Sequence, residues 1–276
     1  MNINDNMIDP MCQVSQLPLD IMHSLFKYLK ADLPRLAQVC KEWKSLIDED
    51  EFRAMIRPAN AFGSREWKQY IKVEAGQEPR LPLWAYGFDV KDEYMLTFIP
   101  DKVEVSKEDG TKEVVIMDNL EAIGQLVKKP ITDLETGYNT DIQDDSEDYK
   151  LWVDKAIKEK RPQEKPHWVW IKKEGIGRRN NFKAQEWLAK ERKAPISGLI
   201  DTVISLFMEY ARSKERHFIW DPNKNEVTLV RVNEKTDGRR ICIGFVPSGL
   251  SVYYCLDAYT RDHVAFASGR KSIGIW

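Results

Sequence analysis

The residues best suited to catalysis or metal binding are few and widely spaced. The histidines stand at positions 23, 167, 217 and 263, and none pairs with a cysteine or a carboxylate at metal-ligand spacing. Residues 244–249, Gly-Phe-Val-Pro-Ser-Gly, lack the G-x-S-x-G spacing of a nucleophile turn, so a plain β-turn explains them better. Cys255, Asp257 and His263 are an equally weak candidate for a catalytic triad. We therefore expect no metal, no cofactor and no catalytic residue.

A second kind of chemistry is anion binding by a basic loop with two glycines. Gly175-Ile176-Gly177-Arg178-Arg179 could hold a phosphate or an acidic target through backbone N–H groups and two guanidinium forks. The loop lacks the third glycine of a dinucleotide fingerprint and the Gly-Lys-Ser/Thr of a P-loop. The candidate contacts to an anion or a target protein are Lys172, Lys173, Arg178 and Arg179.

Two segments of opposite charge follow one another in the chain. Between Asp133 and Asp154 eight acidic residues accompany one lysine, and between Lys158 and Lys193 twelve basic residues accompany five glutamates. The local charges of −7 and +7 nearly cancel, which favours segments that face solvent or each other. Tryptophan and phenylalanine side chains interleave the basic segment, so binding of single-stranded nucleic acid is an alternative.

The composition describes a soluble globular protein. The 276 residues are 42% hydrophobic and 31% charged, and the net charge of −2 gives no global attraction to nucleic acid or to an anionic membrane. Cys12, Cys40, Cys242 and Cys255 form no C-x-x-C pair, which indicates reduced thiols in a cytosolic compartment. No signal peptide and no membrane span is evident, so we expect a cytoplasmic protein.

The elements that must position these residues begin with a short helical segment. Within residues 16–50 a Leu-Pro pair opens a helix, and apolar residues then recur at i, i+3 and i+4. The pattern predicts two or three short amphipathic helices. A segment of about 35 residues buries too little surface to be stable alone, so it must pack on another surface.

The same segment resembles an F-box. The resemblance is carried by Leu17-Pro18, the Ile21, Leu25 and Leu29 stripe, Asp32-Leu33, and Val39-Cys40-Lys41-Glu42-Trp43 with Leu46 behind it. It implies a trihelical module that packs on the Skp adaptor of Skp–cullin–F-box ubiquitin ligases. The adaptor-facing or module-core positions that it implies are Leu17, Pro18, Ile21, Leu25, Leu36, Val39, Cys40 and Trp43. The alternative is an N-terminal helical hairpin that packs on its own domain.

The remainder of the chain mixes strands and helices without regular βαβ alternation. Tyr94–Ile99 and Val114–Met117 alternate like strands and flank a Lys-Glu-Asp-Gly turn, which predicts a hairpin. Residues 197–213 carry a broad apolar helical face and should lie across a sheet. The strands expected after them cover 217–220, 227–232, 240–246, 250–256 and 264–267. The pattern favours an α+β fold with a mainly antiparallel sheet and packed helices.

These observations divide the chain into a disordered lead (1–14), an F-box (15–57) and an α+β domain (58–276) that recruits a substrate. No internal repeat is present, which excludes the leucine-rich, WD-type propeller and Kelch domains. The runs FG-x-x-EW-x-x-Y, HWVW and GF-x-PSGL-x-V resemble uncharacterised F-box proteins of chlamydia-like bacteria. That resemblance implies a secreted bacterial effector that acts in the host cytosol.

The expected function is that of a non-catalytic adapter. The F-box would bind a Skp-type adaptor and, through it, a cullin, while the second domain recruits a target protein for ubiquitination. One alternative is an effector enzyme whose C-terminal domain modifies a host protein and which the F-box tethers. Another is nucleic-acid binding through Lys158–Lys193, which predicts a steep salt dependence.

Overall fold

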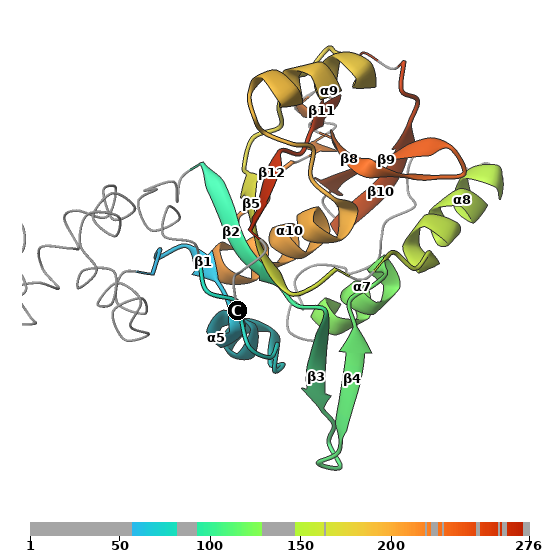
Figure 1. Cartoon of the computed structure of the whole chain (residues 1–276). Coiled ribbons are helices and arrows are strands. Elements are labelled where there is room, and N and C mark those ends of the chain that lie inside the picture. Colours follow the sequence, from blue (N-terminus) through green and yellow to red (C-terminus); the bar gives the residue numbers. More distant parts are fainter. Residues whose placement is uncertain are drawn as a thin grey trace, which may run out of the picture. The chain divides into compact units, whose positions relative to one another are not determined.

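The computed structural model of the chain describes residues 57–81, 93–128, 147–162, 164–218, 220–221, 226–227, 229–246, 249–258, 260 and 264–272 (Figure 1). The predicted trihelical F-box lies outside the described residues, as does the predicted lead. The chain divides into two compact units, Met1–Ala59 with Leu81–Lys91 and Asn60–Arg80 with Asp92–Trp276. Within the described residues, no helix combines the length and the apolar character that a membrane crossing requires.

The second unit contains two four-stranded sheets. The first has the order β1 (Ala61–Phe62), β2 (Tyr94–Ile99), β5 (His167–Lys172) and β12 (Gly269–Ser272). The second has the order β10 (Gly249–Cys255), β9 (Arg239–Val246), β8 (Leu229–Thr236) and β11 (Val264–Phe266). Only the β1–β2 and β8–β11 pairs of these sheets are parallel, and both lie at a sheet edge. The mainly antiparallel α+β architecture is therefore confirmed.

Residues 264–272 join the two sheets, since β11 pairs with β8 and β12 pairs with β5. The chain passes between them at Gly269, whose backbone N–H donates to Pro195 O at 2.9 Å. A Cβ at Gly269 would lie 2.7 Å from Ile171 Cδ1 and 2.7 Å from Ser197 Oγ. A side chain at this position would therefore have to displace those of Ile171 and Ser197.

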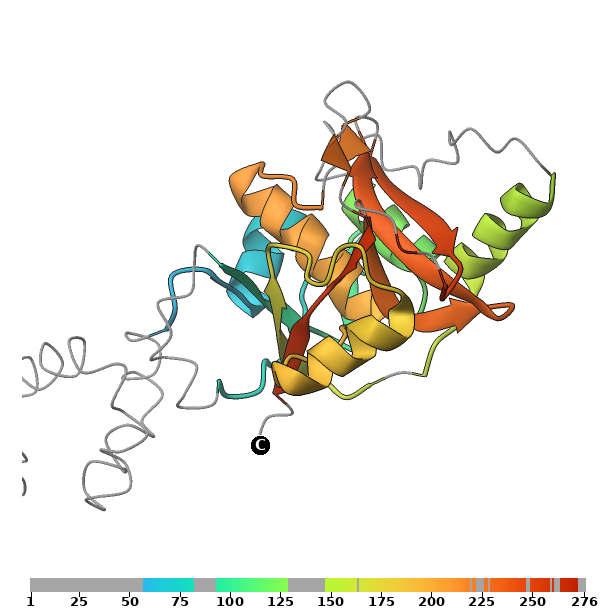
Figure 2. The same ribbon diagram turned by 90° about the horizontal axis from the view of Figure 1, so that it is seen from above.

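Both sheets pack on one central helix, α10 (Leu199–Ser213), which contacts β2, β5 and β8 (Figures 1 and 2). Eleven of its fifteen residues are buried. The apolar spacing of Val203, Ile204 and Phe207 predicts this helix, and its place across the sheets is confirmed.

The predicted hairpin has the right turn but the wrong first strand. Residues 107–111 form the turn between β3 (Lys102–Ser106) and β4 (Lys112–Ile116), and this pair extends away from the sheets at the bottom of Figure 1. β2 instead pairs with β5. Five of its six residues are buried, so it suits the interior of a sheet better than an exposed hairpin.

The hairpin formed by β8 and β9 is tighter than its sequence suggests. β8 continues to Thr236, and only Asp237 and Gly238 form the turn, with φ angles of 50° and 74°. Asp-Gly is the dipeptide that two-residue turns with positive φ prefer. The expected strands 227–232 and 240–246 are therefore too short at the ends that face each other, since β8 extends to Thr236 and β9 begins at Arg239.

The described part of the unit also contains shorter elements. Its other helical segments are α5 (Ser64–Glu66), the π-helical turn η3 (Trp67–Ile71), α7 (Leu120–Lys128), α8 (Glu147–Lys158) and α9 (Phe182–Glu191). A small strand pair, β6 (Trp220–Asp221) and β7 (Glu226–Val227), follows α10. The expected strand at 217–220 is wrong at its start, because Phe218 has a φ of 56° and the strand begins only at Trp220.

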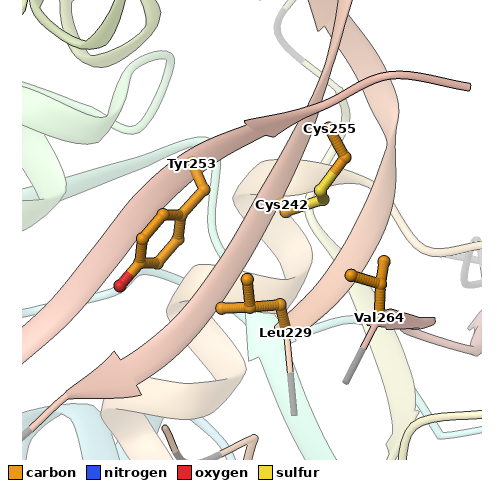
Figure 3. Close-up of a cluster of buried hydrophobic side chains, with 5 residues drawn as sticks. All are labelled: Leu229, Cys242, Tyr253, Cys255 and Val264. Carbon is orange, nitrogen blue, oxygen red and sulfur yellow. A yellow bond between two sulfur atoms is a disulfide. The ribbon is translucent and has the colours of Figure 1, made fainter. Parts of the chain in front are cut away.

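Two cysteines predicted to be free thiols form a disulfide, Cys242–Cys255. Cys242 pairs with Tyr253 in the β9–β10 register, so Cys255 is its diagonal neighbour. The bridge lies in a buried cluster with Leu229 and Val264 (Figure 3). The expectation of reduced cysteines is therefore wrong for this pair, and Cys255 is not available as the nucleophile of a triad.

Candidate functional site

The four predicted anion contacts occupy two different environments. Lys172 ends β5, and Lys173 follows it with its Nζ 2.9 Å from Glu209 Oε1 and 3.7 Å from Glu215 Oε2. Arg178 and Arg179 are exposed in the loop that leads into α9. The structure therefore separates a lysine engaged inside the domain from two arginines at its surface.

Glu209, Glu215 and His217 place three ligand atoms within 4.8 Å of one another, a grouping that the sequence did not suggest. The Lys173 ammonium and the Arg212 guanidinium already pair with Glu209. Burial and the charge of Lys173 lower the pKa of His217, so its imidazole is neutral at pH 7. The cluster is thus neutralised by cations of the chain itself.

The predicted phosphate loop is held as part of the sheet framework. Ile176 and Phe266 exchange two backbone hydrogen bonds of 3.1 and 2.8 Å, so the amide of Ile176 is already engaged. Gly177 has a φ of 70°, and a Cβ there would lie 3.2 Å from the Phe266 ring and 3.3 Å from Leu188 Cδ1. These contacts fix the loop against α9 and carry Arg178 and Arg179 with it.

Arg231 of β8 is fully buried and ties this region together. Its Nη1 donates to Asn180 O and to Gln185 Oε1, both at 3.0 Å, and its Nη2 donates to Leu256 O at 3.2 Å. The amide of Gln185 in turn donates to Gly177 O at 2.9 Å. One guanidinium thus connects the basic loop, α9 and the end of β10. An arginine inside the apolar run of residues 229–232 is the sequence signal that could have indicated this role.

The outer face of α9 is exposed and carries a large apolar side chain. Phe182, Gln185 and Ala189 face the domain, whereas Lys183, Trp187 and Lys190 lie on the opposite side at i, i+4 and i+7. Trp187 is 61% exposed, while Trp67, Trp152, Trp168 and Trp170 are buried. In the part of the chain whose side chains are described, Trp187 is the one exposed tryptophan.

The charges around Trp187 are mostly positive. Between residues 178 and 193 all eight charged side chains are exposed; six are basic and two acidic, a net charge of +4. Arg178 and Arg179 precede α9, and Arg192 and Lys193 follow it. We call residues 178–193 the α9 surface. Figure 1 shows α9 at an edge of the domain.

A pocket of about 240 Å³ with several charged side chains in its lining lies at the start of α10. Its charged lining residues are Asp101, Asp118, Arg161, Glu164, His167, Asp201, Glu234 and Lys271. His167 and Asp201 are both buried, and His167 Nε2 lies 3.1 Å from Asp201 Oδ1. A histidine paired with a buried aspartate in a pocket is a common start for a catalytic site.

Both ring nitrogens of His167 are already engaged. Nδ1 lies 2.8 Å from Lys165 O, so it carries a proton and donates to this carbonyl. Burial alone would lower the pKa of His167, but the hydrogen bond and the charge of Asp201 raise it above its ordinary value. Both ring nitrogens therefore face acceptors, and neither is placed to take a proton from a substrate.

The carboxylates of this pocket are also engaged. Burial would raise the pKa of Asp201, but His167 and Lys271 outweigh it and lower the pKa. Lys271 Nζ lies 2.9 Å from Asp201 Oδ2 and 2.7 Å from Glu164 Oε1. Burial raises the pKa of Glu234, whose Oε2 accepts the Leu199 N–H at the start of α10. The geometry indicates a network that anchors α10.

The predicted adaptor-binding residues lie outside the described residues. They are Leu17, Pro18, Ile21, Leu25, Leu36, Val39, Cys40 and Trp43.

Comparison with known proteins bears on that segment. Residues 14–55 match the F-box-like family, whereas no curated protein and no solved structure matches the chain. The match agrees with the resemblance of residues 15–57 and adds nothing on the remainder of the chain, for which the likeness to proteins of chlamydia-like bacteria is unsupported. The chain therefore carries an F-box-like domain at residues 14–55.

Proposed function

We propose that this protein is a substrate receptor of a cullin-based ubiquitin ligase. The observation that carries the proposal is the F-box-like domain at residues 14–55, since such domains generally bind Skp-type adaptors. A separate α+β unit follows this domain, which suits a receptor that holds a target with its second domain. The protein itself needs no catalytic residue in this role.

The mechanism is proximity. The F-box would dock on the adaptor and through it on the cullin, while the α+β domain binds the target. Holding both partners in one assembly raises the effective concentration of target lysines near the charged conjugating enzyme. The assembly acts in the cytosol, or in the host cytosol if a bacterium delivers the protein.

Adaptor capture tests the proposal directly. In Leu17→Ala/Pro18→Ala/Trp43→Ala, three residues of the predicted adaptor surface lose their side chains, so the variant should no longer retain a purified Skp-type adaptor. Lys27→Ala/Lys30→Ala, a change at two polar positions of the same segment, should retain it. Near-UV circular dichroism should show that the α+β domain of both variants is folded. Equal adaptor capture by the triple variant and the wild type contradicts the proposal.

The pocket at α10 is the observation that favours a second candidate, an enzyme tethered by the F-box. It gathers His167, Asp201 and Glu234, whose environments shift their pKa values in different directions. The engaged nitrogens of His167 weigh against this candidate. Glu234→Gln keeps the shape of the side chain and removes its ability to give or take a proton. A host-protein modification that Glu234→Gln abolishes, in a variant that still captures the adaptor, would support the enzyme.

A further inference from the structure

We infer that the α9 surface is the docking site for an acidic segment of the target protein, one that places an apolar side chain between carboxylates. The inference rests on the proposed function, because it names the kind of target that the receptor recruits. It is argued from the exposure of Trp187, from the charge of residues 178–193 and from the rigidity of the elements that carry them.

Trp187 supplies the apolar contact. At 61% exposure its indole is available to a partner, and tryptophan is among the residues that contribute most to binding at protein interfaces. Leu256 is also 61% exposed, and its carbonyl is bound by the buried Arg231 that holds α9. The same framework therefore presents two large apolar side chains to solvent.

Lys183 and Lys190 supply the charge on either side of Trp187. Seven residues of helix separate them, a rise of about 10 Å, which an extended peptide covers in about three residues. No ion pair joins either lysine to another described residue. A partner with carboxylates on both sides of a leucine or a phenylalanine would match this row in charge and in spacing.

The platform beneath this row is ordered before any partner binds. Arg231 bonds to Asn180 and to Gln185, and Gly177 packs against Leu188 of α9. Little conformational entropy is therefore lost by the receptor on binding, which favours affinity. The rigid elements also explain why Arg178 and Arg179 stay beside α9.

The experiment measures binding of the full chain to fluorescein-labelled peptides with a central leucine, phenylalanine or serine and with flanking aspartates, serines or lysines. We expect binding only to acidic peptides with an apolar centre, weaker at 300 mM than at 50 mM NaCl. Trp187→Ala should weaken this binding about tenfold. Lys183→Glu/Lys190→Glu should abolish it, and Trp187→Phe should preserve most of it.

Leu151→Ala is the matched control, because Leu151 is 69% exposed on α8 and lies outside the α9 surface. Its peptide binding should equal that of the wild type. Peptide binding that is the same in Trp187→Ala as in the wild type would overturn the inference, as would binding that follows peptide charge alone. Tighter Trp187-dependent binding of an oligouridylate than of any peptide would also overturn it, in favour of nucleic acid.

The chain's own acidic segment is the remaining competitor for this surface. If replacing the five aspartates and glutamates between 133 and 145 by serine raises peptide binding strongly, the occupant is this segment and the inference fails. Adaptor capture by the same variants separates the inference from the proposed function. A variant that loses peptide binding but still captures the adaptor has a defect in the α9 surface alone. A wild-type protein that captures no adaptor would refute the receptor role, whatever its peptide binding.

Discussion

Replacing Arg231 tests whether one buried guanidinium holds the α9 surface in place. Arg231→Met keeps most of the side-chain volume and removes the donors to Asn180 O, Gln185 Oε1 and Leu256 O. Hydrogen bonds to a charged group contribute about 1.5–3 kcal/mol each, and relief from burying the charge offsets about half to two thirds of the sum. We expect a loss of about 2–3 kcal/mol in the free energy of unfolding.

Two measurements check this expectation. For a chain of this size, the loss corresponds to a fall in Tm of roughly 4–12 °C, which differential scanning calorimetry resolves. Hydrogen exchange should show lower protection of the α9 amides than of the α10 amides, because the lost bonds hold α9 and not α10. Arg231→Lys should also destabilise the domain, since one ammonium cannot reach three acceptors in fork geometry.

Arg192→Met is the control, because Arg192 is exposed at the end of α9. Its effect should stay within about 0.5 kcal/mol. An Arg231→Met protein with the Tm of the wild type and unchanged α9 protection would show that the guanidinium is dispensable. The rigidity argued for the α9 surface would then fail.

Three further predictions follow from the same framework. Gly269→Ala should cost about 1–3 kcal/mol in urea unfolding, because its Cβ would overlap Ile171 Cδ1 and the Ser197 side chain. Adding Ile171→Val, which removes Cδ1, should recover part of this loss, and additive losses would contradict this explanation. In His167→Gln the free energy of unfolding should fall less from pH 6 to pH 8 than in the wild type. The reason is that the raised pKa of His167 stabilises the wild type below about pH 6.5, and this stability is lost as the pH rises. Parallel pH profiles of the two proteins would contradict the prediction. Cys242→Ser should lower stability by about 2–3 kcal/mol, and reduction of the wild type should do the same, whereas an unchanged urea midpoint would exclude the disulfide.

The elements that the sequence predicts well are those whose signals are local. The apolar face of α10 repeats with helical period, so residues 197–213 predict this helix by themselves. Asp237-Gly238 fixes a two-residue turn through its backbone conformation alone. Each of these features depends on neighbours within a few positions, so no knowledge of distant partners is needed.

The features that escape prediction depend on pairing between distant residues. The partner of β2 is β5, some seventy positions away, and nothing within residues 94–99 selects it over β4. The disulfide depends in the same way on the register of β9 and β10, which makes Cys242 and Cys255 diagonal neighbours. Lys173 was predicted as an anion contact because its charge is visible in the sequence, whereas its pairing with Glu209 is visible only in the fold.

For the candidate binding site, the sequence predicts the charge, but only the fold shows which charged side chains remain at the surface. The sequence predicts that residues 158–193 are basic, but it does not separate cations that neutralise the interior from those that remain at the surface. The structure makes this separation: Lys173 is half-buried and pairs with the buried Glu209, whereas Lys183 and Lys190 flank an exposed indole. If the protein bound no partner, packing this indole against the domain would be more favourable than leaving it in solvent, because its apolar area would be removed from water. An exposed tryptophan between two lysines on a rigid helix face is the surface that the proposed acidic partner would cover, because tryptophan contributes strongly to binding at protein interfaces.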